Sequence, residues 1–263
     1  MHYSSKIVLT LLCAVLASSV AHAAEPGALA SAKRALQSAV NHAAPDEMLK
    51  ARSRFEAMSA AEPGSALLHY WVAVADWRLT PFLSGTDKVK AARYCKDGID
   101  HCDKAIALDP RFGEAIALKG GLQGMSIQFE PGSMMTLGPQ SVANTRRAIT
   151  LAPNSPRVWL LDGLGTLNKP EQFGGGAVPA GETLDRAAAL AAADSSADSA
   201  APDWGHDDAF LWAGRAAMMR KDYASAREDF SKALALNPGN GWVRARLLPE
   251  AEKALADSAE VKP

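Results

Sequence analysis

The sequence predicts an all-α fold in which antiparallel helix pairs stack into a solenoid. A helix-stopping proline returns at Pro63, Pro110 and Pro153, and again at Pro238 after about twice the interval. Alanine, the strongest helix former, is abundant, and no alternating β-branched segment long enough for a strand occurs. The long last interval indicates that one unit has lost its closing proline, so we expect five repeats between residues 27 and 238.

The clearest copy of the repeat lies at residues 207–238, as two short amphipathic helices joined by a tight turn. Small residues such as Gly214 allow the two helices to approach closely, while Phe210 and Phe230 fill the space between them. This stretch resembles a tetratricopeptide repeat (TPR). The resemblance implies a right-handed superhelical solenoid that binds other molecules and usually carries no chemistry of its own.

The chain begins with the pattern of a secretory signal peptide at residues 1–23. Lys6 gives the positive start, residues 7–16 an apolar core, and Ala-His-Ala up to Ala23 a cleavage site. The core is too short to span a bilayer, and no later stretch is apolar enough. We expect cleavage after Ala23 and export, to the periplasm or alternatively into the medium.

The rest of the chain divides by composition and periodicity. We expect long loops inside the repeats and a polar capping helix at the end, as solenoids require. The expected segments are repeats 1–4 at 24–192, a low-complexity flexible connector at 193–206, repeat 5 at 207–238, a capping helix at 239–257 and a tail at 258–263.

Two cysteines remain after the signal peptide. Cys95 and Cys102 are seven residues apart, which along one helix separates their Cα atoms by about 10 Å. A disulfide requires less than about 7 Å. Either the helix is broken between them, or, as we expect, both are free thiols in the core. His101 points away from Cys102 on a helix, so we predict no metal site there.

The TPR resemblance implies that the first helix of each repeat lines a concave binding face. Aromatic residues, methionine and arginine are enriched at interface cores, and arginine binds carboxylates through two hydrogen bonds. This face is therefore the predicted site for an extended peptide or a partner helix. The candidate residues are Tyr70, Trp77, Arg78, Glu114, Met125, Arg157, Asn168, Asp208, Leu211, Arg215 and Met219.

Three insertions, at residues 80–86, 130–139 and 168–176, fall at the same place in their repeats and should emerge on one edge of the solenoid. They either close the edge of the core or present a shared apolar patch. The third, with the residues just before it, resembles a loop of exported bacterial TPR-type proteins of uncharacterised role. The edge candidates are Phe82, Met134, Met135, Phe173, Gly174, Gly175 and Gly176.

The three consecutive glycines allow two interpretations, a tight turn or a cradle of free N–H groups for an anion. No Gly-Lys-Ser/Thr follows them, which argues against a nucleotide-binding loop. His206, Asp207 and Asp208 form the densest group of potential metal ligands, but acidic residues before a helix are more simply explained as a cap. We therefore expect no metal, no cofactor and no enzymatic activity.

The charge balance argues against a general nucleic-acid binder, since 27 basic and 29 acidic residues remain after Ala23. The favoured function is an exported scaffold that binds a protein or peptide partner in the cell envelope. The alternative is a small-molecule or solute-binding accessory protein of a transport system, with a pocket roofed by the insertions. An open groove with Tyr70, Trp77 and Arg157 exposed would favour a peptide. A deep pocket roofed by Phe82, Met134 and Phe173 would favour a small ligand.

Overall fold

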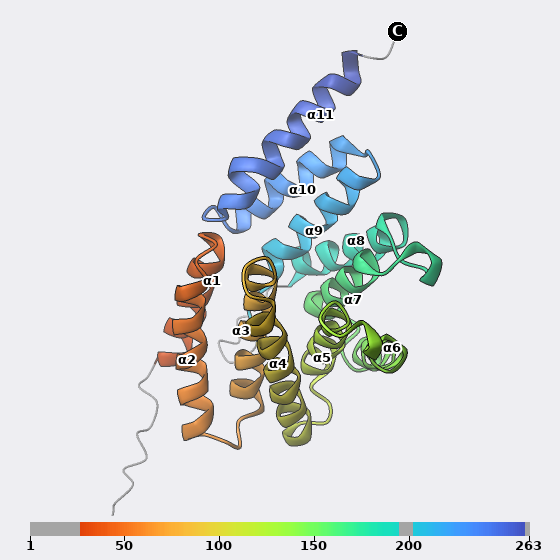
Figure 1. The fold of residues 1–263 in the computed structure, drawn as a ribbon. Coiled ribbons are helices and arrows are strands. Elements are labelled where there is room, and N and C mark those ends of the chain that lie inside the picture. The colour runs from red at the N-terminus through yellow and green to blue at the C-terminus, as the bar shows by residue number, and fades with distance from the viewer. Residues whose placement is uncertain (1–26, 195–201, 261–263) are drawn as a thin grey trace, which may run out of the picture.

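A computed structural model describes residues 27–194 and 202–260, and within them it contains helices and no strand (Figure 1). The predicted all-α solenoid is confirmed. Its helix pairs are α1 (Ala28–Asn41) with α2 (Pro45–Ala61), α3 (Ala66–Ser84) with α4 (Lys88–Leu108), α5 (Gly113–Ser126) with α6 (Met134–Leu151), α7 (Pro156–Asn168) with α8 (Ala177–Ala193), and α9 (His206–Met219) with α10 (Tyr223–Leu236). The predicted signal peptide and residues 195–201 of the predicted connector lie outside the described residues.

Shorter elements complete the chain. A single turn, η1 (Pro131–Ser133), precedes α6, and another, η2 (Glu171–Phe173), precedes α8. After α10, a π-helical turn, η3 (Val243–Leu247), leads into α11 (Leu248–Glu260). α11 packs against α10 and extends past the predicted end of the capping helix at residue 257.

Within a pair, the small residue of one helix faces the large residue of the next. A Cβ atom added to Gly214 would lie 2.7 Å from Phe230, and one added to Gly163 would lie 2.6 Å from Leu184. Real Cβ contacts are essentially never that short, so a side chain at either position would have to displace its neighbour. The small and large residues that alternate in the sequence therefore face each other where the two helices of a pair pack.

The first two expected insertions are not loops, and this corrects the sequence interpretation. α3 continues through Pro81 to Ser84, and α6 begins at Met134 and includes Pro139. Proline inside a helix removes a backbone hydrogen bond. In α3 this loss is offset by the burial of Leu79 and Leu83 on either side. The extra length of the repeat is therefore longer helix, and of the three insertions only residues 168–176 remain mainly a loop.

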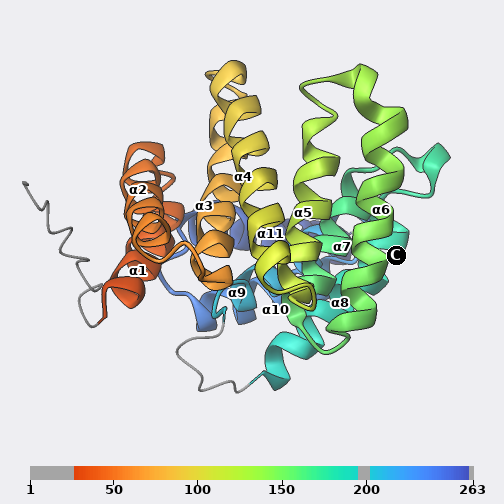
Figure 2. The same cartoon turned by 90° about the horizontal axis from the view of Figure 1, so that it is seen from below.

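The solenoid turns tightly enough for its first and last pairs to touch. The side-chain amides of Asn41, at the end of α1, and Asn237, after α10, donate hydrogen bonds to each other at 2.9 and 2.8 Å. Figure 1 shows this end of α1 below the turn that joins α10 to α11. In the view of Figure 2, α9 and α10 lie between α1 on one side and α7 on the other. The first helices of distant repeats consequently meet at the centre of the molecule.

Both cysteines are free and fully buried, as the sequence predicts. α4 is unbroken between Cys95 and Cys102, which keeps the thiols apart. Burial raises the pKa of the Cys95 thiol to about 11, and this thiol lies 3.2 Å from the carbonyl oxygen of Leu122. Nδ1 of His101 lies 3.2 Å from Nδ1 of His69. Within the described residues, no group of three or more His, Cys, Asp or Glu side chains is placed to hold a metal ion.

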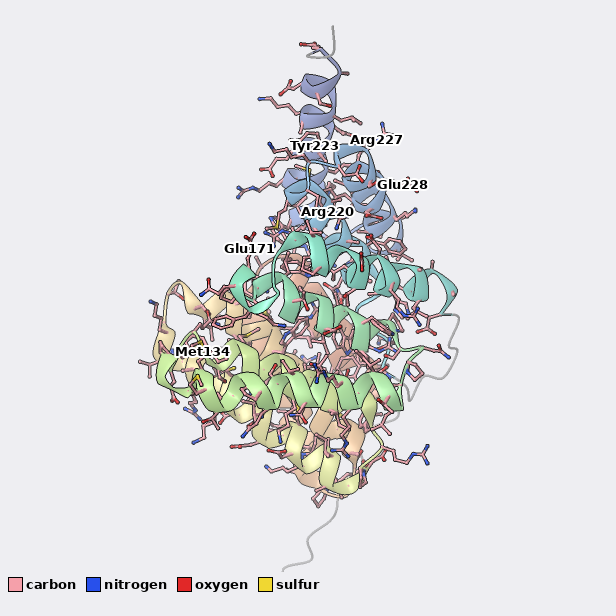
Figure 3. The ribbon with its side chains drawn as sticks, turned by 90° about the vertical axis from the view of Figure 1, so that its right-hand side faces the viewer. Met134, Glu171, Arg220, Tyr223, Arg227 and Glu228 are labelled. Atoms are coloured by element: carbon pink, nitrogen blue, oxygen red, sulfur yellow. The ribbon has the colours of Figure 1, made fainter. Side chains whose placement is uncertain are left out.

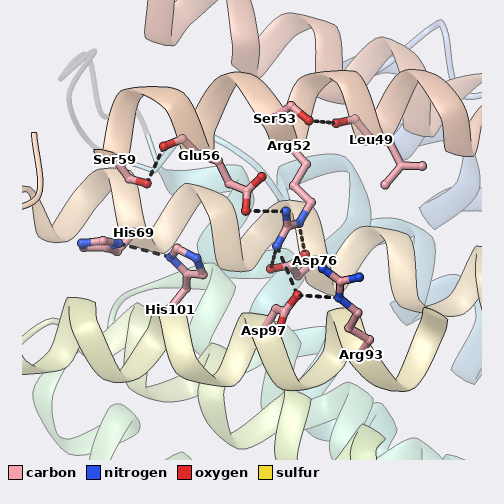
Figure 4. A network of polar contacts seen from close by, with 10 residues as sticks. All are labelled: Leu49, Arg52, Ser53, Glu56, Ser59, His69, Asp76, Arg93, Asp97 and His101. Atoms are coloured by element: carbon pink, nitrogen blue, oxygen red, sulfur yellow. Dashed lines mark hydrogen bonds and ion pairs between the residues drawn. The ribbon is translucent and has the colours of Figure 1, made fainter. Parts of the chain in front are cut away.

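An arginine-centred network joins α2, α3 and α4 (Figure 4). Arg52 donates to the fully buried carboxylate of Asp76, and also contacts Glu56 at 2.7 Å and Asp97 at 3.6 Å. Burial raises the pKa of Asp76 to about 7, although Arg52 opposes this shift. Because this folded-state pKa differs from the ordinary value of an aspartate, the protonation of Asp76 links the stability of the fold to pH.

We expect the free energy of unfolding to fall by roughly 1 kcal/mol between pH 6 and 7.5 through Asp76 alone. The folded-state pKa lies above the unfolded value of 3.8, so this contribution is fully present below that value and is lost as the pH rises through about 7. Urea unfolding followed by circular dichroism at several pH values measures the slope, and Asp76→Asn should flatten it. An unchanged slope in Asp76→Asn would contradict the assignment.

Candidate functional site

The centre of the concave face is filled by the chain itself. Trp204, two residues before α9, is only 5% exposed, and its indole Nε1 donates to the hydroxyl of Tyr70 at 2.9 Å. Its ring lies 5.2 Å from that of Trp77. The expectation of a flexible connector is therefore wrong for residues 202–206, because burial of a large aromatic side chain fixes this end of the connector.

Arg78 joins the second repeat to the fifth beside this tryptophan. Its guanidinium lies 4.6 Å from the Trp77 ring centroid and 5.2 Å from that of Trp204. Both nitrogens of its fork donate to Asp208, one at 2.9 Å to Oδ1. Both side chains of the pair are nearly buried. Two residues predicted to bind a partner thus bind each other across 130 positions of sequence.

Arg157 is also used internally. It is 5% exposed, its Nε donates to Oε1 of Glu114 at 2.8 Å, and its Nη1 donates to the backbone carbonyl of Trp204 at 3.2 Å. Asp194 lies 3.7 Å away. Arg157 of α7 binds a carboxylate, as predicted, but the carboxylate is that of Glu114 in the same chain.

The remaining concave candidates divide by exposure. Leu211 is buried, Met125 is partly buried against the core, and Arg215 stacks 4.6 Å from the centroid of Trp212, where burial lowers its pKa. Asn168 and Met219 are exposed. Tyr70, Trp77 and Arg157, whose exposure would favour a peptide, are buried by the tight turn of the solenoid. Their role toward a partner stays a prediction.

The apolar residues of the insertions lie on the outside of the molecule. Phe82, Met134, Met135 and Phe173 are 36%, 42%, 81% and 57% exposed. Figure 3 shows Met134 at the outer end of α6 and Glu171 in the loop before α8. The two cavities described below are lined by other residues. A roof over a small ligand stays a prediction for these four side chains.

The three glycines form a tight turn and not an anion cradle. Gly174 and Gly176 have φ of 79° and 107°, which favours glycine. Their N–H groups donate to Glu171 O and Thr166 O at 2.8 and 3.0 Å, and that of Gly175 donates to Pro170 O at 3.2 Å. Since all three donors are used within the turn, none is directed toward a ligand.

We expect Gly175→Ala to destabilise the protein by roughly 2 kcal/mol or more, because its Cβ would lie 1.9 Å from the carbonyl oxygen of Lys169. Gly165→Ala is the matched control, since the added methyl group meets nothing within 4 Å on an exposed position of α7. It should stabilise by roughly 0.5–1 kcal/mol through helix propensity. Urea unfolding measures the change in the free energy of unfolding for both variants. Equal changes would contradict the close contact between Gly175 and Lys169.

The His206, Asp207 and Asp208 group is divided among three partners. His206 contacts Asp194 at 3.0 Å, Asp207 accepts from the amide of Asn237 at 2.7 Å, and Asp208 binds Arg78. These contacts fix the start of α9 against α8, α3 and the end of α10. The separate orientations argue for a structural role of the group.

Part of the concave side remains accessible between α1, α3 and the segment before α9. A cavity of about 280 Å³ there is lined by Lys33 and Arg34 of α1, Trp71 and Arg78 of α3, and Trp204, among others. A second cavity, of about 510 Å³, lies between α10 and α11 next to Arg227 and Leu255. Neither was predicted, and the lining of the first comes from segments far apart in the sequence, whose proximity no sequence pattern reveals.

The comparisons with known proteins agree with this architecture. Residues 208–240 match the tetratricopeptide repeat family. The HusA haemophore from Porphyromonas gingivalis is similar in structure, with a TM-score of 0.59 and 22% identity over 71% of this chain and 91% of that one. No curated protein matches the sequence.

Two further solved structures are similar at lower scores. One is MamA from Desulfovibrio magneticus RS-1, with a TM-score of 0.38 and 15% identity over 81% of this chain and 97% of that one. The other is YrrB, described as a TPR protein with an unusual peptide-binding site, with a TM-score of 0.37 and 17% identity over 88% and 92%.

The fold and the matched repeat together define the class of protein, an α solenoid of the helical-repeat type. More narrowly, the fifth helix pair carries a stretch, residues 208–240, that matches the tetratricopeptide repeat family. TPR proteins bind protein partners and are generally non-catalytic. Within the described residues, no helix is both long enough and apolar enough to cross a membrane.

Proposed function

We propose that this chain is an exported, non-catalytic scaffold that binds a protein or peptide partner in the cell envelope. We further propose that its concave face recognises an extended segment that carries an aromatic side chain next to a carboxylate. Export is supported by the signal-peptide pattern of residues 1–23, and the binding role by the TPR fold.

The observation that carries the proposal is how the concave face holds its own segment, Pro202–Gly205. The Trp204 ring lies beside Tyr70 and Trp77, and its carbonyl accepts from Arg157. The carboxylate of Asp203 lies 3.2 Å from the ammonium of Lys33. Side-chain slots combined with a hydrogen bond to the main chain are the contacts by which repeat proteins hold extended peptides.

The test supplies this segment as a separate peptide. Trp204→Ala empties the aromatic slot, so a capped peptide of residues 202–206 should bind this variant and raise its melting temperature by a few degrees. Wild-type protein, whose slot is filled, should bind the peptide at least tenfold more weakly. The same peptide with alanine in place of tryptophan is the control ligand.

A second variant, Trp204→Leu, guards against loss of folding, because leucine keeps part of the apolar contact. Circular dichroism establishes which variant is folded before fluorescence polarisation measures binding. If the peptide binds neither folded variant, or if the alanine peptide binds equally well, the concave face does not recognise such segments in trans and the proposal fails.

The alternative, a small-molecule binder, has one specific observation in its favour, the cavity of about 280 Å³ beside α1. HusA is described as a haemophore, but a likeness at 22% identity supports the fold alone. Titration with haem and with small anions, followed by tryptophan fluorescence, tests this alternative. Saturable binding that survives Trp204→Ala would place the ligand elsewhere than in this cavity.

A further inference from the structure

Arg215 of α9 is an arginine without a carboxylate partner among the described residues. Its guanidinium lies 4.6 Å from the ring centroid of Trp212 and 5.0 Å from that of Trp242, and the two rings meet edge to face at 6.3 Å. No described residue forms a hydrogen bond or an ion pair with it. By contrast, Arg78 and Arg157 each bind a carboxylate of the chain. The donor groups of Arg215 are therefore unused within the described fold.

These donor groups are also accessible. The Arg215 side chain is half-buried, and none of its nitrogens is among the fully buried polar atoms that lack a partner in the described chain. Trp242 is 41% exposed, and Met219, one helical turn after Arg215 in α9, is 58% exposed. A guanidinium that two indoles hold in place is thus flanked by apolar side chains that reach the surface.

The charges around Arg215 leave an excess of positive charge. Burial, and then repulsion from Arg246, lower the pKa of Arg215. Glu250 opposes this shift, but it already binds Arg246 at 2.9 Å. A carboxylate from another molecule would supply the missing negative charge. The planar fork of arginine binds a carboxylate through two hydrogen bonds, and its fixed position reduces the entropy lost on binding.

The shape of this region favours a protein segment over a small molecule. Small-molecule sites are concave, and neither of the two cavities described above is lined by these side chains. Arginine, methionine and tryptophan are the residue types enriched at the cores of protein interfaces. We refer to the set as the Arg215 surface, which consists of Trp212, Arg215, Met219, Trp242 and Arg246.

We propose that the Arg215 surface binds an acidic segment of a partner protein, in which a glutamate or aspartate lies between apolar side chains. The carboxylate accepts from the guanidinium of Arg215, and the apolar side chains pack on Trp242 and Met219. This inference rests on the proposed scaffold role, because the occupant is a protein segment. It uses a surface other than the one that holds Trp204.

A short acidic peptide and ¹⁵N-labelled protein give a direct test. In an extended capped peptide Leu-Ser-Glu-Ser-Leu, the glutamate and both leucines lie on one face. Titration should shift the indole N–H signals of Trp212 and Trp242, which Trp212→Phe and Trp242→Phe identify by their loss. The Nε–H signal of Arg215 should move downfield, as a new hydrogen bond does. The same peptide with glutamine in place of glutamate should bind roughly tenfold more weakly, because the bonds to a charged acceptor are lost.

Substitutions with a matched control locate the site. Arg215→Gln should weaken binding roughly tenfold, and Arg215→Lys, which keeps the charge but not the planar fork, should recover only part of the loss. Arg246→Gln changes a side chain that is 70% exposed, so the variant should fold, and it should weaken binding several-fold by removing the neighbouring positive charge. Arg54→Gln removes an exposed arginine of α2, outside the Arg215 surface, and should leave affinity unchanged.

Several results would overturn the proposal. Thermal unfolding first shows that the variants are folded. The proposal fails if the two peptides bind equally, if Arg215→Gln and Arg54→Gln lose equal affinity, if only other tryptophan signals shift, or if nothing binds at millimolar concentration. Tighter binding of a thymidine oligonucleotide at the same signals would also overturn it, since the surface would then favour nucleic acid. Binding of the 202–206 peptide to Trp204→Ala is measured separately, so each proposal can fail while the other stands.

Discussion

Trp204→Ala is expected to lower the free energy of unfolding by about 3–5 kcal/mol. The substitution removes a ring that is 5% exposed and contacts the second repeat through Tyr70 and Trp77. It also leaves the hydroxyl of Tyr70, in a fully buried side chain, without its donor. Since domains are typically stable by 5–15 kcal/mol, this is a large fraction of the total.

The matched control is Trp242→Ala, because Trp242 is 41% exposed and lies outside the concave centre. It should lower stability by roughly 1 kcal/mol, mainly through its contact with Arg215 at 5.0 Å. Urea unfolding by circular dichroism measures both. If both variants lose a similar free energy of unfolding, the segment before α9 is only loosely attached. That result would contradict the tight packing of this segment against the second repeat.

The second large effect is expected at the ion pair between Arg78 and Asp208. Asp208→Asn or Arg78→Met alone should destabilise by about 3–5 kcal/mol, because each leaves one buried charge without its partner. The double variant should be more stable than either single variant. Replacement of a whole buried ion pair by neutral groups is often close to neutral.

The double-mutant cycle gives the measurement, and the exposed pair Arg246 and Glu250 gives its control. These side chains are 2.9 Å apart within the C-terminal helical segment but 70% and 50% exposed, so their coupling should stay below about 1 kcal/mol. Additive losses at Arg78 and Asp208 would contradict the buried pair, and with it the direct contact between the second and fifth repeats.

The fold class was predictable because its signals are local. Gly214 opposite Phe230 and Gly163 opposite Leu184 lie within single pairs, about 16 to 21 positions apart, and their spacing follows the helical period. The free thiols of Cys95 and Cys102 followed from their positions on one helix. The helices around Pro81 and Pro139 were missed, because a proline normally predicts a break. At Pro81 the burial of Leu79 and Leu83 against neighbouring helices overrides this tendency.

The residues of the candidate site could be predicted from the sequence. Their exposure and their partners in the folded chain could not. Arg157 does hold a carboxylate, but no sequence pattern indicates that the carboxylate is that of Glu114 and not that of a partner. The Gly174–Gly176 turn was one of two open interpretations, and the hydrogen bonds of its three N–H groups decided between them. The cavity beside Trp71 was not foreseen, since its walls come from α1, α3 and the segment before α9.

Three features follow from local sequence: the all-α repeat fold, the pairing of small with large residues, and the buried thiols. Each depends on residues within one or two helices. The tertiary structure alone decided that the concave face closes on Trp204. That closure depends on contacts between residues 130 to 196 positions apart, Arg78 with Asp208 and Asn41 with Asn237. The curvature of a solenoid is the sum of small rotations between successive pairs, and no single stretch of sequence encodes that sum.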